Sequence, residues 1–144
     1  MTLRPDTLPY RKPELGQDYW IKDNILPDPC EVADRCFNRT AWILGSPWRP
    51  EPWPGMRSPQ ALEPDELAVV ERWALAQTGA KALRTQGDPA GGQSSHNFCQ
   101  LVGGADGVSR PHVDSSRLCD FAAVLFLHPF PPTRHAGTSF YRLK

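Results

Sequence analysis

The sequence lacks the features that mark an exported, membrane-bound or nucleic-acid-binding protein. No apolar run approaches the roughly 20 residues of a membrane span, and the longest, residues 121–127, has only the length of a strand. The first twenty residues contain no apolar core of the kind found in signal peptides, so we expect none. Lys plus Arg and Asp plus Glu number 16 each, with no basic block, which argues against binding to nucleic acid or to a membrane surface. We therefore expect a soluble cytoplasmic domain.

The cysteines do not form a zinc-binding pattern. There are four, and none belongs to a C-x-x-C pair. Because no export signal is visible, free thiols are the expected state. The four positions are Cys30, Cys36, Cys99 and Cys119.

Proline and glycine are abundant instead. Sixteen prolines and eleven glycines in 144 residues predict long irregular connections and argue against a helical bundle. The length suits one domain with its own core. We expect residues 1–17 to form a polar N-terminal arm and residues 18–144 to form a single oxygenase-like domain, complete or truncated at its C-terminus.

Two helices are predicted. The first covers residues 29–40, with Asp28 as its N-cap and proline at its first position. Its buried face would hold Val32 and Cys36, with Phe37 as a further candidate. The second covers residues 63–83, where apolar residues follow the helical period and acidic residues crowd the first turn.

The remaining chain is expected to be extended or looped. Residues 18–29 and 96–102 read as strands, and residues 103–107 as a turn. The segment 45–60 carries five prolines and two tryptophans, so we expect neither a helix nor a central strand there. It would be a loop pinned by its tryptophans over the core, or the wall of a pocket. Residues 120–129 are apolar on both faces and predict a strand buried on both sides.

The stretch SRPHVDSS, residues 109–116, contains a possible half of a metal site. His112 and Asp114 stand at i and i+2, so on an extended chain their side chains point the same way. Such a pair is common by chance. Its context is more specific, because an apolar run and then HAGTSFYR, residues 135–142, follow it.

This order of motifs resembles the iron(II)/2-oxoglutarate-dependent oxygenases of the prolyl-hydroxylase-like type. In that family an H-x-D motif supplies two ligands of a facial triad, a hydrophobic strand follows, and a strand with the pattern GGxxxF comes next. The resemblance implies that His112 and Asp114 bind Fe(II), which leaves open positions for 2-oxoglutarate and dioxygen. It also implies hydroxylation of an unactivated C–H bond.

The resemblance suggests candidate contacts for the co-substrate. Asn97 and Gln100 lie on the strand before H-x-D, where the family often places a polar contact. Arg142 offers a guanidinium suited to a carboxylate, although it does not align with the arginine that the family uses.

The third metal ligand stays open. The family's second histidine lies several strands beyond the GGxxxF strand, whereas this sequence ends at Lys144. The chain is therefore a truncated or split member, or it uses a local histidine, or it binds no metal. The local candidates are His128 and His135, and His96 is a weaker candidate.

These inferences define one expectation for the fold and two for the function. The fold is α+β, a partial double-stranded β-helix of the jelly-roll or cupin-like kind, with N-terminal helices packed on the sheet. The function is that of a non-haem iron(II)/2-oxoglutarate-dependent oxygenase acting on an amino acid, peptide or small metabolite. The alternative is a truncated, non-catalytic binding or interaction module, whose open sheet edge would favour a homodimer.

Overall fold

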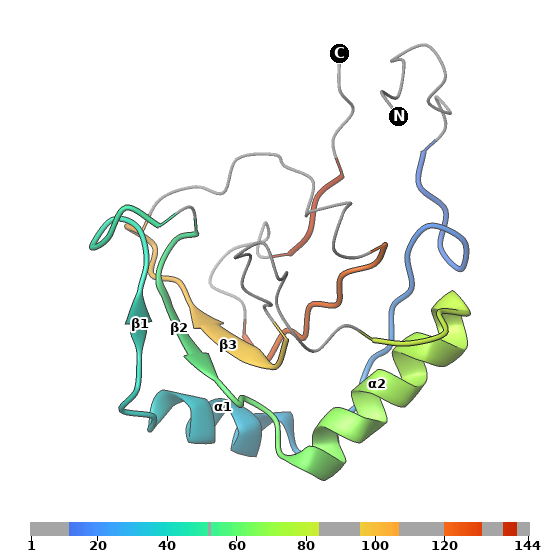
Figure 1. Cartoon of the computed structure of the whole chain (residues 1–144), viewed down its shortest axis with the longest axis horizontal. Coiled ribbons are helices and arrows are strands. Elements are labelled where there is room, and N and C mark those ends of the chain that lie inside the picture. Colours follow the sequence, from blue (N-terminus) through green and yellow to red (C-terminus); the bar gives the residue numbers. More distant parts are fainter. Residues whose placement is uncertain (1–11, 52, 84–95, 107–119, 131–136, 141–144) are drawn as a thin grey trace.

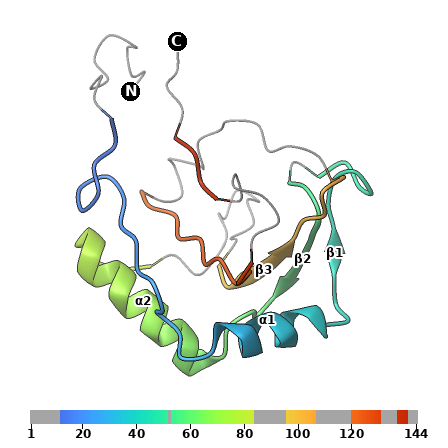
Figure 2. The same cartoon turned by 180° about the vertical axis from the view of Figure 1, so that it is seen from behind.

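A computed structural model describes residues 12–51, 53–83, 96–106, 120–130 and 137–140. Three strands form an antiparallel sheet in the order β1-β2-β3, and α1 lies across one end of it in both views (Figures 1 and 2). That this sheet forms part of a double-stranded β-helix stays a prediction. The elements in chain order are α1 (Pro29–Phe37), β1 (Ile43–Leu44), β2 (Met56–Pro59), α2 (Pro64–Thr78) and β3 (Phe98–Leu101).

Helix α1 begins where the sequence predicts. The Asp28 carboxylate accepts a hydrogen bond of 2.9 Å from the backbone N–H of Glu31, which satisfies one of the free donors of the first turn. Val32 is fully buried and Cys36 nearly so, which confirms both predictions. Phe37 is 62% exposed, so the prediction that it might share the buried face is wrong. It is the last residue of the helix and lies one position beyond the face that Val32 and Cys36 define.

Helix α2 has a capped start and an early end. The backbone N–H of Glu63 donates to the Glu66 carboxylate at 2.8 Å, the reciprocal arrangement of a capping box. The helix ends at Thr78 and not at residue 83, because Gly79 adopts a left-handed conformation (φ 66°) and its N–H bonds to the carbonyl of Leu75. None of the described side chains of α2 is fully buried, although Val70 packs against the core.

The core is a small cluster where α1 meets the sheet. Around it pack half-buried side chains, among them Trp42 from the chain after α1 and Leu62 from the chain before α2. The cluster therefore joins α1, α2 and β3 with the chain that precedes α1 and with residues 125–127. Its buried apolar members are Leu26, Val32, Cys36, Ala61 and Cys99.

Strand β2 corrects the expectation that residues 45–60 hold no central strand. It pairs with β1 on one side and β3 on the other. Four of the five prolines of this segment precede the strand, and the fifth, Pro59, is its last residue, so three N–H groups remain for the sheet. The approach to β2 is tight: a Cβ on Gly55 (φ 80°) would lie 2.1 Å from the carbonyl oxygen of Leu101.

The strand predicted in residues 18–29 is absent from the structure. Tyr19 makes one isolated bridge to Leu15, and the backbone turns at Asn24, whose φ is 53°. Leu26 is then buried in the core and Ile25 packs against it, so this segment is held by side-chain packing and not by a sheet. The strand predicted in residues 96–102 is confirmed as β3. The turn predicted in residues 103–107 is confirmed for the described residues 103–106, where the Asp106 N–H donates to the Gly103 carbonyl at 3.0 Å.

Residues 120–130 also differ from their prediction. No strand forms there, and most of their side chains are exposed. Leu125 and Leu127 pack against the core, whereas Val124 and Phe126 are 66% and 60% exposed. Buried and exposed side chains thus alternate over residues 124–127, because the described chain covers only one face of this segment. In both views it projects between the sheet and α2 (Figures 1 and 2).

Two further expectations concern the thiols and the membrane. Cys30, Cys36 and Cys99 are free, whereas Cys119 lies outside the described residues. In the ranges that the structure describes, neither helix is long and apolar enough to cross a bilayer.

The N-cap of α1 yields a stability prediction. Asp28→Ala removes the acceptor for the Glu31 N–H and should lower the free energy of unfolding by about 1 kcal/mol. Asp23→Ala removes a nearby exposed carboxylate and should change it by less than about 0.5 kcal/mol. Urea unfolding followed by circular dichroism measures both, and equal losses in the two variants would contradict the assigned cap.

Candidate functional site

The two residues of the predicted metal half-site, His112 and Asp114, lie outside the described residues, as do His135 and Arg142. The structure does describe the strand that leads toward them. β3 ends at Leu101, and the Gly103 N–H donates to the Asp106 carboxylate in the turn that follows. The chain thus leaves the sheet eleven residues before His112, and the turn that follows is fixed as far as Asp106, six residues before His112.

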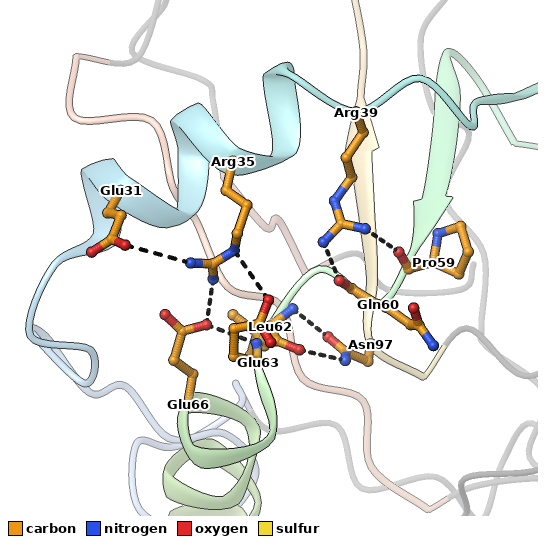
Figure 3. A network of polar contacts seen from close by, with 9 residues as sticks. All are labelled: Glu31, Arg35, Arg39, Pro59, Gln60, Leu62, Glu63, Glu66 and Asn97. Carbon is orange, nitrogen blue, oxygen red and sulfur yellow. Dashed lines mark hydrogen bonds and ion pairs between the residues drawn. The ribbon is translucent and has the colours of Figure 1, made fainter.

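Asn97, a candidate contact for the co-substrate, is held by the chain just before α2. Its side-chain oxygen accepts from the Leu62 N–H at 2.8 Å, and its amide nitrogen donates to the Leu62 carbonyl at 3.0 Å (Figure 3). The Asn97 carbonyl also accepts from the Ala61 N–H at 3.0 Å. Asn97 has φ 53°, a left-handed conformation that asparagine tolerates better than most residues. The carboxamide of Asn97 therefore makes the two hydrogen bonds that the backbone of a paired strand residue would make, and it links the chain before β3 to the chain before α2.

Gln100, the second candidate contact, lies on the exposed side of β3. Its amide nitrogen donates to the Pro54 carbonyl at 2.8 Å, and its oxygen lies 3.5 Å from the Arg57 guanidinium. That guanidinium also stacks over the Trp53 ring, 4.5 Å from its centre. Gln100 and Asn97 are thus both engaged in structural contacts, on opposite ends of the strand.

His128, the local candidate for the third ligand, is exposed. Its Nδ1 accepts a hydrogen bond of 3.1 Å from the Phe130 N–H. A neutral imidazole that accepts at Nδ1 carries its proton on Nε2, so neither nitrogen is ready to bind a metal. Binding through Nδ1 would use the lone pair that accepts from Phe130, and binding through Nε2 would move the proton to Nδ1, so this hydrogen bond would be lost in either case.

His96 also has a partner. Its Nε2 lies 2.8 Å from a Glu71 carboxylate oxygen, and both side chains are partly buried. The pair joins the start of β3 to the middle of α2. Across the ranges 12–51, 53–83, 96–106, 120–130 and 137–140, no three His, Cys, Asp or Glu side chains form a group that could hold a metal ion.

A polar network around α1 is the largest feature that the sequence did not predict. Arg35 bonds to the Glu66 carboxylate at 2.5 Å and lies 3.8 Å from that of Glu63, so α1 is tied to the start of α2 (Figure 3). Arg39 donates to the carbonyls of Pro59 and Gln60 at the end of β2. The sequence signals for this network were the E-P-D-E run at the start of α2 and the i, i+4 spacing of Glu31 and Arg35.

Comparison with protein-family models, with curated proteins and with solved structures yields no match to this chain. The family resemblance therefore rests on the motifs of the sequence itself.

The Asn97 contacts give a prediction that separates two roles for this residue. Asn97→Ala removes the side-chain partners of both backbone groups of Leu62 and places alanine at a positive φ that it tolerates less well than asparagine, so it should lower the unfolding free energy by roughly 2–4 kcal/mol. Gln100→Ala, which removes exposed contacts only, should lower it by less than about 1 kcal/mol. Thermal and urea unfolding measure both. If Asn97→Ala were as stable as the parent, its role in holding Leu62 would be refuted.

Proposed function

We propose that this chain is a non-haem iron(II)/2-oxoglutarate-dependent oxygenase that hydroxylates an amino acid, a peptide or a small metabolite. The observation that carries the proposal is the His112-x-Asp114 pair placed shortly after an antiparallel strand and its closed turn. The apolar run and the HAGTSFYR stretch that follow it add support, because they come in the order of the family that the sequence resembles.

The roles of the residues follow from their chemistry. His112 and Asp114 would hold the iron with one neutral nitrogen and one anionic oxygen, a donor pair suited to Fe(II). Asn97, Gln100 or Arg142 would hold the co-substrate. When bound, the iron would activate dioxygen, which is the oxidant for C–H hydroxylation, and 2-oxoglutarate would be oxidised to supply the other two electrons. Selectivity for the substrate would lie in the loops around this site.

The proposal includes a cytoplasmic location. Cys30, Cys36 and Cys99 are free thiols, which suits a reducing compartment. Balanced charge and the lack of a basic block give no reason to expect nucleic acid or membrane partners.

Anaerobic titration of the chain with Fe(II) and 2-oxoglutarate tests the oxygenase proposal. We expect the weak visible charge-transfer band of the chelated co-substrate in the parent protein and its loss in His112→Ala. His96→Ala is the matched control, because its imidazole pairs with Glu71, and it should keep the band. Circular dichroism shows that each variant is folded. A folded parent chain without a band would contradict the proposal.

His128→Ala addresses the third ligand in the same titration. If His128 were the ligand, the variant would lose the band as His112→Ala does. We expect it to keep the band, because Nδ1 of His128 already accepts from the Phe130 N–H.

A second candidate function, a non-catalytic interaction module, is favoured by the exposed apolar side chains of residues 121–130. Four of them would be unusual on the free surface of a monomer if they lay in one patch. We propose that a second copy of the chain is the partner in this case, since packing the same apolar side chains of two copies against each other would remove them from water. The exposed fractions are 48% for Phe121, 66% for Val124, 60% for Phe126 and 83% for Phe130.

Sedimentation velocity tests the module. Phe126→Lys should shift a concentration-dependent dimer toward the monomer by at least tenfold in the dissociation constant. Phe37→Lys is the matched control, because Phe37 is equally exposed, at 62%, but lies on α1. A parent chain that is monomeric at all concentrations would rule the dimer out.

A further inference from the structure

We propose that Cys36 and Cys99 are a reversible modification site, at which a peroxide converts two buried thiols into a disulfide that ties α1 to β3. This inference does not depend on the oxygenase proposal, because it uses no residue of the predicted metal site.

The two thiols are neighbours in the core. Cys36 comes from the buried face of α1 and is 6% exposed, and Cys99 comes from the middle of β3 and is 8% exposed. Both belong to the same buried cluster, and the Cys36 thiol is among the neighbours that raise the pKa of Cys99. The Cys99 thiol also lies 3.5 Å from the Ser58 carbonyl of β2, to which it donates. The pair is therefore placed by three different elements.

The surroundings favour a dithiol over a metal centre. Among the residues that the structure describes, no His, Asp, Glu or further Cys joins the pair to make a group of three possible metal ligands. The remaining described thiol, Cys30, is exposed at the start of α1, six residues before Cys36. We therefore consider the pair as two thiols that can be oxidised to a disulfide.

The reaction balances with hydrogen peroxide as the oxidant. Peroxide oxidises one thiolate to a sulfenic acid, and the O–O bond breaks with release of one water after proton transfer. The second thiol then attacks the sulfenic sulfur, an S–S bond forms and a second water leaves. Two thiols and one peroxide thus give one disulfide and two waters, and a reducing dithiol reverses the oxidation.

Burial sets the rate of this reaction. Burial first, and then the Cys36 thiol, raise the pKa of Cys99 to about 11. The thiolate is the species that reacts, so little of it is present at neutral pH. We therefore expect the pair to oxidise more slowly than the exposed Cys30. The dithiol would persist in a reducing compartment and would respond only to sustained peroxide.

The disulfide would restrain most of the described fold. Residues 36 and 99 enclose β1, β2 and α2, so the bond closes a loop that contains three of the five elements. Closing such a loop lowers the entropy of the unfolded chain more than that of the folded one. The oxidised chain should therefore unfold at a higher temperature than the reduced chain.

Peroxide treatment of the Cys30→Ser/Cys119→Ser double variant tests the proposal. We expect the intact mass to fall by two hydrogen atoms, with one cross-linked peptide that joins Cys36 to Cys99. The Tm should rise by roughly 5 °C or more, and dithiothreitol should restore both mass and Tm. Cys99→Ala in the same background is the matched control, and it should gain oxygen at Cys36 without a cross-link.

Peptide mapping of the oxidised parent chain makes the test independent of how the double variant folds. A Cys36–Cys99 peptide in the parent supports the proposal. It would be overturned if both thiols accumulated as sulfinic acid without a cross-link, if the only cross-links involved Cys30 or Cys119, or if the folded chain kept both thiols reduced under peroxide.

Discussion

The short chain from Pro59 to Glu63 is where the described elements meet, and its backbone hydrogen bonds hold them together. Asn97 pairs with both backbone groups of Leu62, and its own carbonyl accepts from Ala61. Arg39 binds the carbonyls on the other side, at Pro59 and Gln60. Because unpaired backbone groups are costly once they are buried, each of these contacts restricts where the chain can run.

These contacts restrain α1, β2, α2 and β3, whereas β1 is held by its pairing with β2. Arg39 follows α1 directly, so its contacts fix α1 relative to the end of β2. Asn97 directly precedes β3, so its contacts fix the position of β3 relative to the start of α2. Arg35 adds an ion pair with Glu66, and α1 thereby reaches α2 as well. Only a small apolar cluster lies beneath this junction, which makes the polar contacts more important here than in a larger domain.

The local parts of the fold were the predictable ones. The N-cap at Asp28, the acidic first turn of α2 and the alternation in β3 depend on neighbouring residues alone, and the structure confirms them. Strand β2 was not predicted because residues 45–60 as a whole are rich in proline, whereas the four residues that pair include only one proline. The prediction of a strand at residues 120–129 was wrong for a different reason. An apolar run shows that burial of its side chains would be favourable, but it does not show that other elements cover both of its faces.

Long-range contacts were beyond the reach of the sequence. Nothing in it pairs Cys36 with Cys99, 63 positions apart, or Arg39 with the end of β2. The same limit applies to Asn97 and Gln100, which were expected to face a co-substrate and are engaged with Leu62 and with Pro54. A carboxamide on a strand serves either role, and only its neighbours in space decide between them.

The central functional claim is that His112 and Asp114 bind iron. Equilibrium dialysis of the full chain under nitrogen, with Fe(II) and 2-oxoglutarate, measures it most directly as iron bound per chain. We expect one iron per folded chain, and an occupancy at least tenfold lower in Asp114→Ala. A folded chain that retains no iron, or an Asp114→Ala variant that binds as much as the parent, would contradict it.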